Sequence, residues 1–333
     1  MRTAGDLEQR VAWITAREFI ERVVWPYAAE HGAPGNDLCE TEKVLDRGTG
    51  RVTVRYRFPQ AEIYGKLYTD ELGPHSQRMI EALEQAGFDP QGPDRVPRSR
   101  YFPEWNLMLS PAVEGRPLMD YLGDDGPEVQ AFVRHAARWL VRLHRLPLRI
   151  GRPEPLWGSL KLSRVLRRVA KAAARAPEER RDMIETIKAL GDLGDASRGE
   201  LPIVQTHGRY HYEHIYVRNG TVTVIDFDRG CPSDPAKDLA EFISVLRLRT
   251  FKRSGSTADA ERLTRLFLET YLAELPGNEV NLPVHCGAFV LMSMLHHLKK
   301  KPKLDATAFE KVSAFYRAEF RSILDGSWLP ASA

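Results

Sequence analysis

The most informative stretch of the chain runs from Thr206 to Phe242 and reads THGRYHYEHIYVRNGTVTVIDFDRGCPSDPAKDLAEF. It combines His-Gly-X, a polar residue five positions after X, a short hairpin, Ile-Asp-Phe, and Asp-Pro-X-X-Asp-Leu-Ala. Asp226 follows an apolar strand pattern at residues 222–225, where a carboxylate requires a partner. Hard cations such as Mg²⁺ are bound by oxygen ligands of this kind. The stretch therefore predicts a metal-binding carboxylate at the end of a strand.

The composition is that of a globular protein large enough for two lobes. The chain has 333 residues, of which 43% are hydrophobic and 28% are charged, and its net charge is +3. That excess of positive charge is too small to indicate nucleic-acid binding by itself. No stretch approaches the ~18 apolar residues of a membrane span, and the charged N-terminus lacks the apolar core of a signal peptide. We therefore expect a cytoplasmic protein whose partners include neither nucleic acid nor membrane.

Hydrophobic periodicity places most strands before most helices. Strands are predicted at 39–45, 52–58, 62–68, 101–105 and 107–111. Helices are predicted at 5–31, 75–87, 129–146, 159–190, 258–275 and 286–297, and a loop at 88–100. This order predicts an α+β protein in three parts, namely an N-terminal helical segment (1–36), a small β-rich lobe (37–112) and a larger, mostly helical lobe (113–333).

Five matches in the same order make the chain resemble the aminoglycoside phosphotransferase family. They are Lys66-Leu-Tyr68, Leu107–Leu118, Leu140–Pro147, His207–Val217 and Val224–Ala240. The resemblance implies a bilobal protein-kinase-like fold and the transfer of a phosphoryl group from ATP. It also implies Mg²⁺ or Mn²⁺ as the cofactor, and a hydroxyl group of a small molecule or peptide as the acceptor.

The resemblance assigns the nucleotide phosphates to the β-rich lobe. Lys66 is expected to pair with them. The candidates for the partner of the lysine are Glu81 and Glu84 on the next helix, and Glu81 is preferred. Gly48 and Gly50 lie in a turn where glycine permits a close approach of the backbone to phosphates. A plain hairpin turn fits the same two glycines.

Two further segments complete the expected nucleotide site. Ser110 and Ala112 lie in the segment that resembles the family's hinge, where backbone groups meet the adenine ring. Asp226 is expected to hold Mg²⁺ against the phosphates. Asp228, two residues further on, is expected to hold a second metal ion or to contact the substrate.

Two other aspartates are predicted to be structural. Asp234 precedes Pro235, and this pair is a preferred helix start. In the family, the aspartate at the position of Asp238 ties the catalytic loop to this helix.

The catalytic loop departs from the family pattern. Arg209 occupies the position of the aspartate that acts as the base, and a guanidinium cannot accept a proton at any relevant pH. We expect Arg209 to bind phosphate or an anionic substrate instead. His214 replaces the metal-binding asparagine and can still ligate a metal. His207 is expected to brace the loop, and His211 and Glu213 are the nearest groups able to accept a proton.

Three functions remain open after this substitution. The first is an ATP-dependent phosphotransferase, because phosphoryl transfer depends mainly on positioning and a lost base costs only ~10²–10⁴-fold. The second is a pseudokinase that binds nucleotide or a partner without transfer, and the third is transfer of AMP. A basic stretch favours an anionic substrate, although a solvated helix face fits the same residues, which are Arg164, Arg167, Arg168, Lys171 and Arg175.

Overall fold

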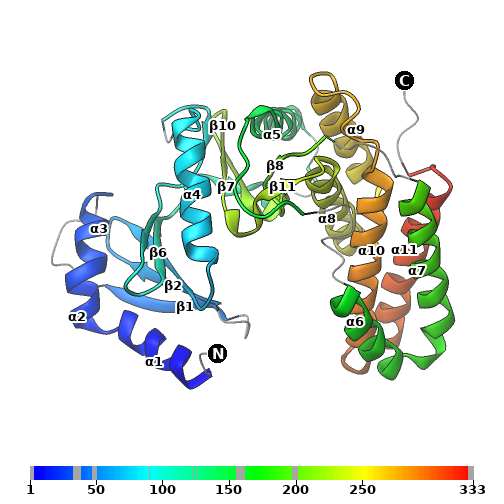
Figure 1. Cartoon of the computed structure of the whole chain (residues 1–333), viewed down its shortest axis with the longest axis horizontal. Helices are drawn as coiled ribbons and strands as arrows, with labels where there is room; N and C mark the ends of the chain where they lie inside the picture. The colour runs from blue at the N-terminus through cyan, green and yellow to red at the C-terminus, as the bar shows by residue number, and fades with distance from the viewer. Residues whose placement is uncertain are drawn as a thin grey trace. The chain divides into compact units, whose positions relative to one another are not determined.

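The structure is a computed structural model that describes residues 4–32, 39–46, 51–89, 91–121, 123–124, 126–154, 162–196 and 202–328. Gly48 and Gly50 lie outside the described residues. The chain divides into two units, the first formed by Met1–Arg116 with Tyr216–Gly230 and the second by Pro117–Ile215 with Cys231–Ala333. Figure 1 labels the α-helices and several strands of both units.

The first unit is built on a five-stranded antiparallel sheet with the order β1-β2-β3-β6-β5. Its strands are β1 (Glu40–Asp46), β2 (Arg51–Arg57), β3 (Glu62–Tyr68), β5 (Arg100–Phe102) and β6 (Leu107–Pro111). Burial alternates along β2 and along most of β3, as expected for a sheet with one covered face. In the β2–β3 register, Arg51 lies opposite Tyr68 and Thr53 lies opposite Lys66.

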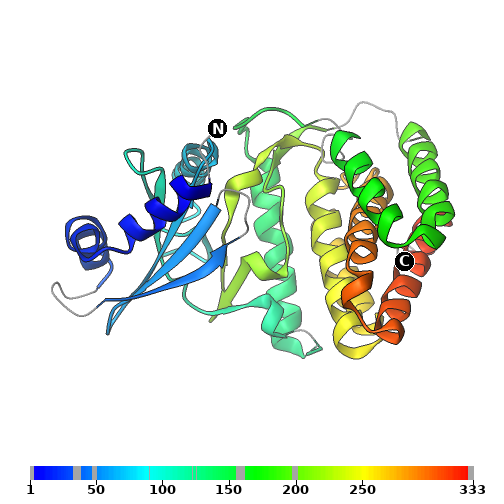
Figure 2. The ribbon, with the colours of Figure 1, turned by 90° about the horizontal axis from the view of Figure 1, so that it is seen from below.

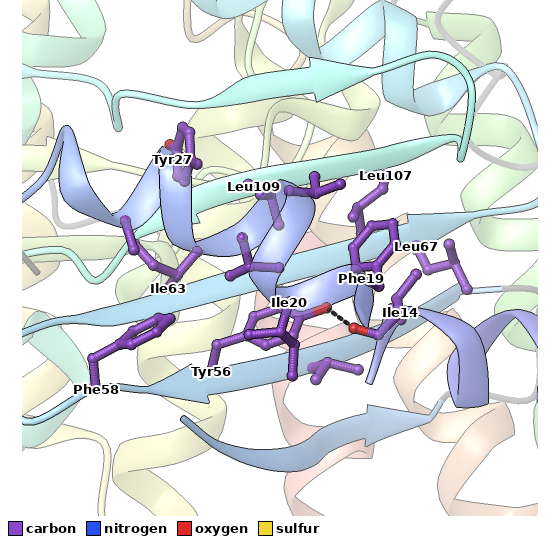
Figure 3. Packing of buried hydrophobic residues seen from close by; sticks show 14 of the residues in the cluster. Ile14, Phe19, Ile20, Tyr27, Tyr56, Phe58, Ile63, Leu67, Leu107 and Leu109 are labelled. Carbon is purple, nitrogen blue, oxygen red and sulfur yellow. Dashed lines mark hydrogen bonds between the residues drawn. The ribbon is translucent and has the colours of Figure 1, made fainter. Parts of the chain in front are cut away.

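The N-terminal helices cover one face of this sheet. They are α1 (Ala4–Ile14), α2 (Arg17–Phe19), the π-helical turn η1 (Ile20–Val24) and α3 (Trp25–Ala29). Figure 3 shows Phe19 and Ile20 packed in one cluster with Tyr56 and Leu109, and the Tyr56 hydroxyl donates a 3.0 Å hydrogen bond to the Ile14 carbonyl. The N-terminal segment therefore shares the core of the β-rich unit, because its apolar stripe is buried against the strands.

A second sheet joins a distant part of the chain to the first unit. It has the order β4-β10-β9-β7 and consists of β4 (Asp94–Arg95), β7 (Arg116–Pro117), β9 (Ile215–Arg218) and β10 (Thr221–Val224). β10 pairs in parallel with β4, with Val222 opposite Asp94. The predicted loop at 88–100 thus contains a strand, since two residues are too short to show periodicity. Residues 216–230, predicted within the helical lobe, belong to the first unit because of this pairing.

The second unit is mostly helical. Its α-helices are α5 (Pro127–Arg145), α6 (Leu162–Arg175), α7 (Arg180–Ala196), α8 (Ala236–Ser254), α9 (Ala258–Leu272), α10 (Leu282–Lys299) and α11 (Ala306–Leu324), most of them green to red in Figure 2. The predicted helix at 159–190 is in fact two helices, α6 and α7, separated by a 3₁₀ turn at Pro177–Glu179. α10 packs against α6, α7, α8 and α11, which explains why it is buried on several sides. No helix in the described ranges is long and apolar enough to span a membrane.

Candidate functional site

Lys66 on β3 forms ion pairs with two carboxylates. Its Nζ lies 2.6 Å from Asp226 Oδ1 and 2.6 Å from Asp228 Oδ2. Glu81, the expected partner, is exposed on α4 (Leu72–Gln85) and accepts a 2.9 Å hydrogen bond from Gln77 Nε2. The structure therefore replaces the expected helix glutamate with the two aspartates that follow β10. The Lys66 side chain is 25% exposed, so it is not sealed in the core.

Asp226 has an unusual backbone conformation. It lies two residues beyond the end of β10, after Ile225. Its backbone angles are φ 70° and ψ 60°, in the left-handed region that residues other than glycine rarely occupy. Such conformations cost of order 1–3 kcal/mol and cluster at functional sites. The carboxylate that the sequence selects as the metal ligand is thus placed by a strained turn, and its side chain is 17% exposed.

Asp228 is buried and surrounded by donors from the protein. Its side chain is 3% exposed. Oδ1 accepts hydrogen bonds from Tyr68 Oη at 2.9 Å and from Ser76 Oγ at 2.7 Å. Oδ2 contacts Arg51 Nη1 at 3.0 Å and Lys66 Nζ at 2.6 Å. These contacts do not match the predicted role of Asp228 as a second metal ligand or substrate contact, because both of its oxygens are already occupied.

The helix α4 is tied to the segment that carries both aspartates. Besides the hydrogen bond from Ser76 to Asp228, His75 Nε2 lies 2.7 Å from the carbonyl oxygen of Gly230. Burial lowers the pKa of His75, so this imidazole is neutral and its Nε2–H donates to the carbonyl. The residues at the start of α4 therefore fix the turn that follows Asp226.

The carboxylates of this region fit a metal ion whose other ligands are phosphate oxygens of a substrate. Within the described ranges, no three His, Cys, Asp or Glu side chains form a group that could hold a metal ion by themselves. Mg²⁺ is commonly held by one or two carboxylates together with substrate phosphates. Asp226 can supply one such carboxylate, whereas Asp228 cannot do so without losing its present donors.

The hinge positions continue the sheet. Ser110 on β6 lies opposite Tyr64, and its Oγ is 2.6 Å from Ser99 Oγ. The amide of Ala112 donates a 2.8 Å hydrogen bond to the carbonyl of Glu62. The Ala112 amide therefore already has an acceptor within the protein. The predicted contact of this segment with an adenine ring stays a prediction.

The catalytic loop lies in the second unit and is anchored by one buried carboxylate. The amides of His207 and Gly208 donate to the two oxygens of Asp238 at 2.7 and 2.8 Å. His144 Nε2 lies 3.2 Å from the same carboxylate. Burial opposes ionisation of Asp238, but the hydrogen bonds from His144 and from the His207 amide hold its pKa below the usual range. Gly208 adopts φ 77°, which explains why glycine follows the histidine.

Hydrogen bonds to the backbone determine how three loop histidines carry their protons. His207 Nδ1 accepts from the amide of Arg209 at 3.2 Å, and His211 Nδ1 accepts from the amide of Glu213 at 3.3 Å. His214 Nδ1 lies 3.0 Å from the carbonyl of Arg209 and must therefore donate. In its neutral form, His214 consequently carries its acceptor lone pair on Nε2. In His207 and His211, the acceptor lone pair is on Nδ1, where it accepts a backbone amide of the loop.

The remaining loop residues have partners of their own. The Glu213 carboxylate forms an ion pair with Arg249 of α8. The backbone of Arg209 is held on both sides, because its amide donates to His207 and its carbonyl accepts from His214. The hydrogen bond from the Arg209 amide is compatible with the predicted role of His207 in bracing the loop. The ion pair with Arg249 makes Glu213 less suited to proton transfer than the sequence indicated.

Several residues of both halves were missed by sequence reasoning. Tyr68 and His144 stand inside quoted motifs, so a signal for them existed, but Arg51 and Ser76 carried none.

Asp234 accepts a hydrogen bond from the amide of Ala236 at 2.9 Å, as predicted for a helix start. The basic residues of α6 whose side chains are described are mostly exposed, namely Arg167, Lys171 and Arg175, with Arg168 half-buried.

Comparisons with known proteins agree with this architecture. The model of the phosphotransferase enzyme family matches residues 55–275, and no curated protein sequence matches the chain. A spectinomycin phosphotransferase in complex with ADP and spectinomycin is 12% identical, covers 86% of this chain and 91% of its own, and has a TM-score of 0.60. A choline kinase from Cryptosporidium parvum Iowa II is 13% identical, with coverages of 93% and 98% and a TM-score of 0.59.

A third similar structure is an ethanolamine kinase from Plasmodium vivax, 14% identical over 97% of this chain and 98% of its own, with a TM-score of 0.54. Identities this low show the fold alone. The α+β fold of these kinases, with a β-rich N-terminal part and a mostly helical C-terminal part, is therefore the fold of this chain, as predicted.

Proposed function

This chain belongs to the phosphotransferase enzyme family, and on that premise we propose that it is an ATP-dependent kinase acting on a hydroxyl group of a small molecule or a peptide. The observation that carries the proposal is the 2.6 Å pair between Lys66 Nζ and Asp226 Oδ1, with Asp226 held in a left-handed turn. A lysine and a carboxylate placed together at a strand end are the groups that phosphoryl transfer requires for phosphate and metal.

Different residues of the first unit would bind different parts of the nucleotide–metal complex. Lys66 presents a partly exposed ammonium group for the phosphate oxygens. Asp226 supplies the carboxylate oxygen for Mg²⁺ or Mn²⁺, which when bound offsets the charge of the phosphates. Because Lys66 contacts Asp226, the protein itself holds the two groups close together, and preorganisation of this kind lowers the cost of binding.

The catalytic loop would act without a carboxylate base. Arg209 cannot accept a proton, so we assign it the binding of phosphate or of an anionic substrate group. Among the imidazoles, His214 is better suited than His211 to take the proton from the hydroxyl, because its Nδ1–H is fixed by the carbonyl of Arg209 and its lone pair lies on Nε2. The same nitrogen is the one that would ligate a metal ion if His214 has that role instead.

The alternative is a pseudokinase that binds nucleotide or a partner without transfer. The observation in its favour is that Glu213, a carboxylate of the loop, is paired with Arg249. The retained contact of Lys66 with Asp226 favours nucleotide binding under both proposals. The exposed cations of α6, among them Arg167 and Lys171, support an anionic acceptor substrate.

Isothermal titration of ATP into the protein, with and without Mg²⁺ or Mn²⁺, tests the shared part of both proposals. We expect binding that requires the metal, and we expect Asp226→Ala to abolish it while the fold is retained. Asp192→Ala is the matched control, because Asp192 is exposed on α7. ADP release with a panel of hydroxyl compounds then separates the kinase from the pseudokinase. Equal affinity of Asp226→Ala and the parent for ATP with Mg²⁺ would refute the assignment.

A further inference from the structure

The carboxylates that hold Lys66 come from the segment after β10 and not from the helix α4. Asp226 and Asp228 each lie 2.6 Å from the ammonium group. What α4 contributes is a hydroxyl, because Ser76 Oγ donates to Asp228 Oδ1 at 2.7 Å. The negative charge expected on the helix is thus found on the turn that carries the metal aspartate.

Asp228 has no capacity left for another ligand. A carboxylate offers about four lone-pair positions, and the two oxygens of Asp228 contact two hydroxyls and two cations. Burial and the neighbouring Asp228 raise the pKa of Tyr68, so its hydroxyl remains a donor. A buried carboxylate is tolerated when it is paired and hydrogen-bonded in this way, and breaking such a pair is costly because it leaves uncompensated charge.

The two aspartates differ in accessibility. Asp226 is 17% exposed, whereas Asp228 is 3% exposed. Arg51 of β2 compensates part of the charge of Asp228, at 3.0 Å. A metal ion approaching from solvent would meet Asp226 and not Asp228.

We propose that Asp228 is a positioning residue that holds Lys66 for the nucleotide phosphates, and that through Ser76 it makes the position of Lys66 depend on α4. Asp226 is then the one metal-binding aspartate of the pair. This inference rests on the proposed function for the role of Lys66, and it replaces the expected direct contact of a helix glutamate with an indirect one, from Ser76 of α4 through Asp228 to the lysine.

The first experiment compares Asp228→Asn with Asp226→Asn in the full chain, with Asp192→Asn as the control. ATP affinity is measured by titration calorimetry, and Mn²⁺ affinity in the presence of ATP by electron paramagnetic resonance. We expect Asp228→Asn to weaken ATP binding by about 10-fold or more, the scale of a lost charge-assisted contact. Mn²⁺ affinity of the ATP complex should change less than about twofold. Asp226→Asn should instead remove the metal dependence. Loss of Mn²⁺ binding in Asp228→Asn would overturn the proposal.

The second experiment moves the carboxylate to the helix. We expect Asp228→Ser to weaken ATP binding and the double variant Ser76→Glu with Asp228→Ser to recover part of the loss. The double variant Ser76→Gln with Asp228→Ser is the matched control, because it restores length without charge. Equal affinities of the two double variants would contradict a role for the charge.

A third readout needs no nucleotide. Acylation of Lys66 by an amine-reactive ester is followed by peptide mass spectrometry, with the exposed Lys188 of α7 as the internal reference. We expect faster labelling of Lys66 in Asp228→Asn and a smaller increase in Ser76→Ala, a mild change that keeps the ion pair. If the parent fails to bind ATP while labelling responds in this order, the proposed function falls and the positioning role stands. Labelling unchanged in both variants overturns the positioning role.

Discussion

Asp228 of the first unit and Asp238 of the second are both buried carboxylates, and each organises the residues around it with a different kind of donor. Among the described residues, the partners of Asp228 are side chains, namely two cations and two hydroxyls. Asp238 binds the backbone amides of His207 and Gly208 in addition to His144. One aspartate therefore depends on which side chains surround it, whereas the other depends mainly on the course of the backbone.

This difference is compatible with the prediction that Arg209 stands where the family has its base. Every residue except proline supplies an amide, so the anchoring of the loop by Asp238 does not involve the side chain at position 209. The network around Asp228 has no such freedom, because replacing Arg51, Tyr68 or Ser76 removes a donor. The anchoring of the loop therefore tolerates many side chains at position 209, whereas the contacts of Asp228 require particular side chains.

Removing the backbone anchor should have the largest effect. We expect Asp238→Ala to lower the free energy of unfolding by about 3–5 kcal/mol, because two amides and His144 are left buried without their acceptor. Urea unfolding measures the loss, and hydrogen exchange should show that the amides of His207 and Gly208 lose protection. Asp192→Ala is the control. Unchanged protection of these amides would contradict the anchoring role.

Removing the phosphate-binding lysine should have the next largest effect. We expect Lys66→Ala to weaken ATP binding by about 1–3 kcal/mol, the range for a lost charge-assisted contact. Titration calorimetry provides the measurement, and Lys188→Ala provides a control of the same chemistry. If the two variants bind ATP equally well, Lys66 has no part in nucleotide binding.

The pH dependence of the unfolding free energy separates the contribution of the negative charge of Asp238 from that of its size and hydrogen bonds. Because the pKa of Asp238 is lowered in the folded protein, its ionised form contributes stability above the unfolded-state pKa of about 3.9. That contribution is lost as the pH falls through the lower folded-state pKa. We therefore expect the gap in unfolding free energy between the parent and Asp238→Asn to be constant from neutral pH to about pH 5 and to shrink below about pH 4. Urea unfolding across this range measures the gap, and a gap that widens in acid would exclude this origin.

Changing the loop side chain should have the smallest effect on folding. We expect Arg209→Asp to alter the free energy of unfolding by no more than about 0.5 kcal/mol, because the anchoring amides are untouched. ADP release with the native substrate should nevertheless fall, since an anion replaces the proposed phosphate-binding cation. A faster variant would show that Arg209 does not bind phosphate, and a strongly destabilised variant would show that the loop depends on this side chain.

The order of elements could be predicted because it arises from local patterns. The strand predicted at 62–68 coincides with β3, and the helix predicted at 129–146 nearly coincides with α5, since each has one face toward a core. β4 and the interruption between α6 and α7 were missed. The first is too short to have a period. The second had a signal that the prediction overlooked, because Pro177 starts the 3₁₀ turn between the two helices.

The sequence by itself determined that Asp226 follows a strand. The resemblance to the family added two predictions, that Arg209 stands at the base position and that Asp238 ties the loop to the following helix. Only the tertiary structure decided the partners of Lys66 and the role of Asp228. Lys66 and Asp226 are 160 residues apart, Ser76 and Asp228 are 152 apart, and Arg51 and Asp228 are 177 apart. A position at a strand end is set by neighbours in the chain, whereas these hydrogen bonds form only when β2, β3 and α4 assemble with the turn after β10.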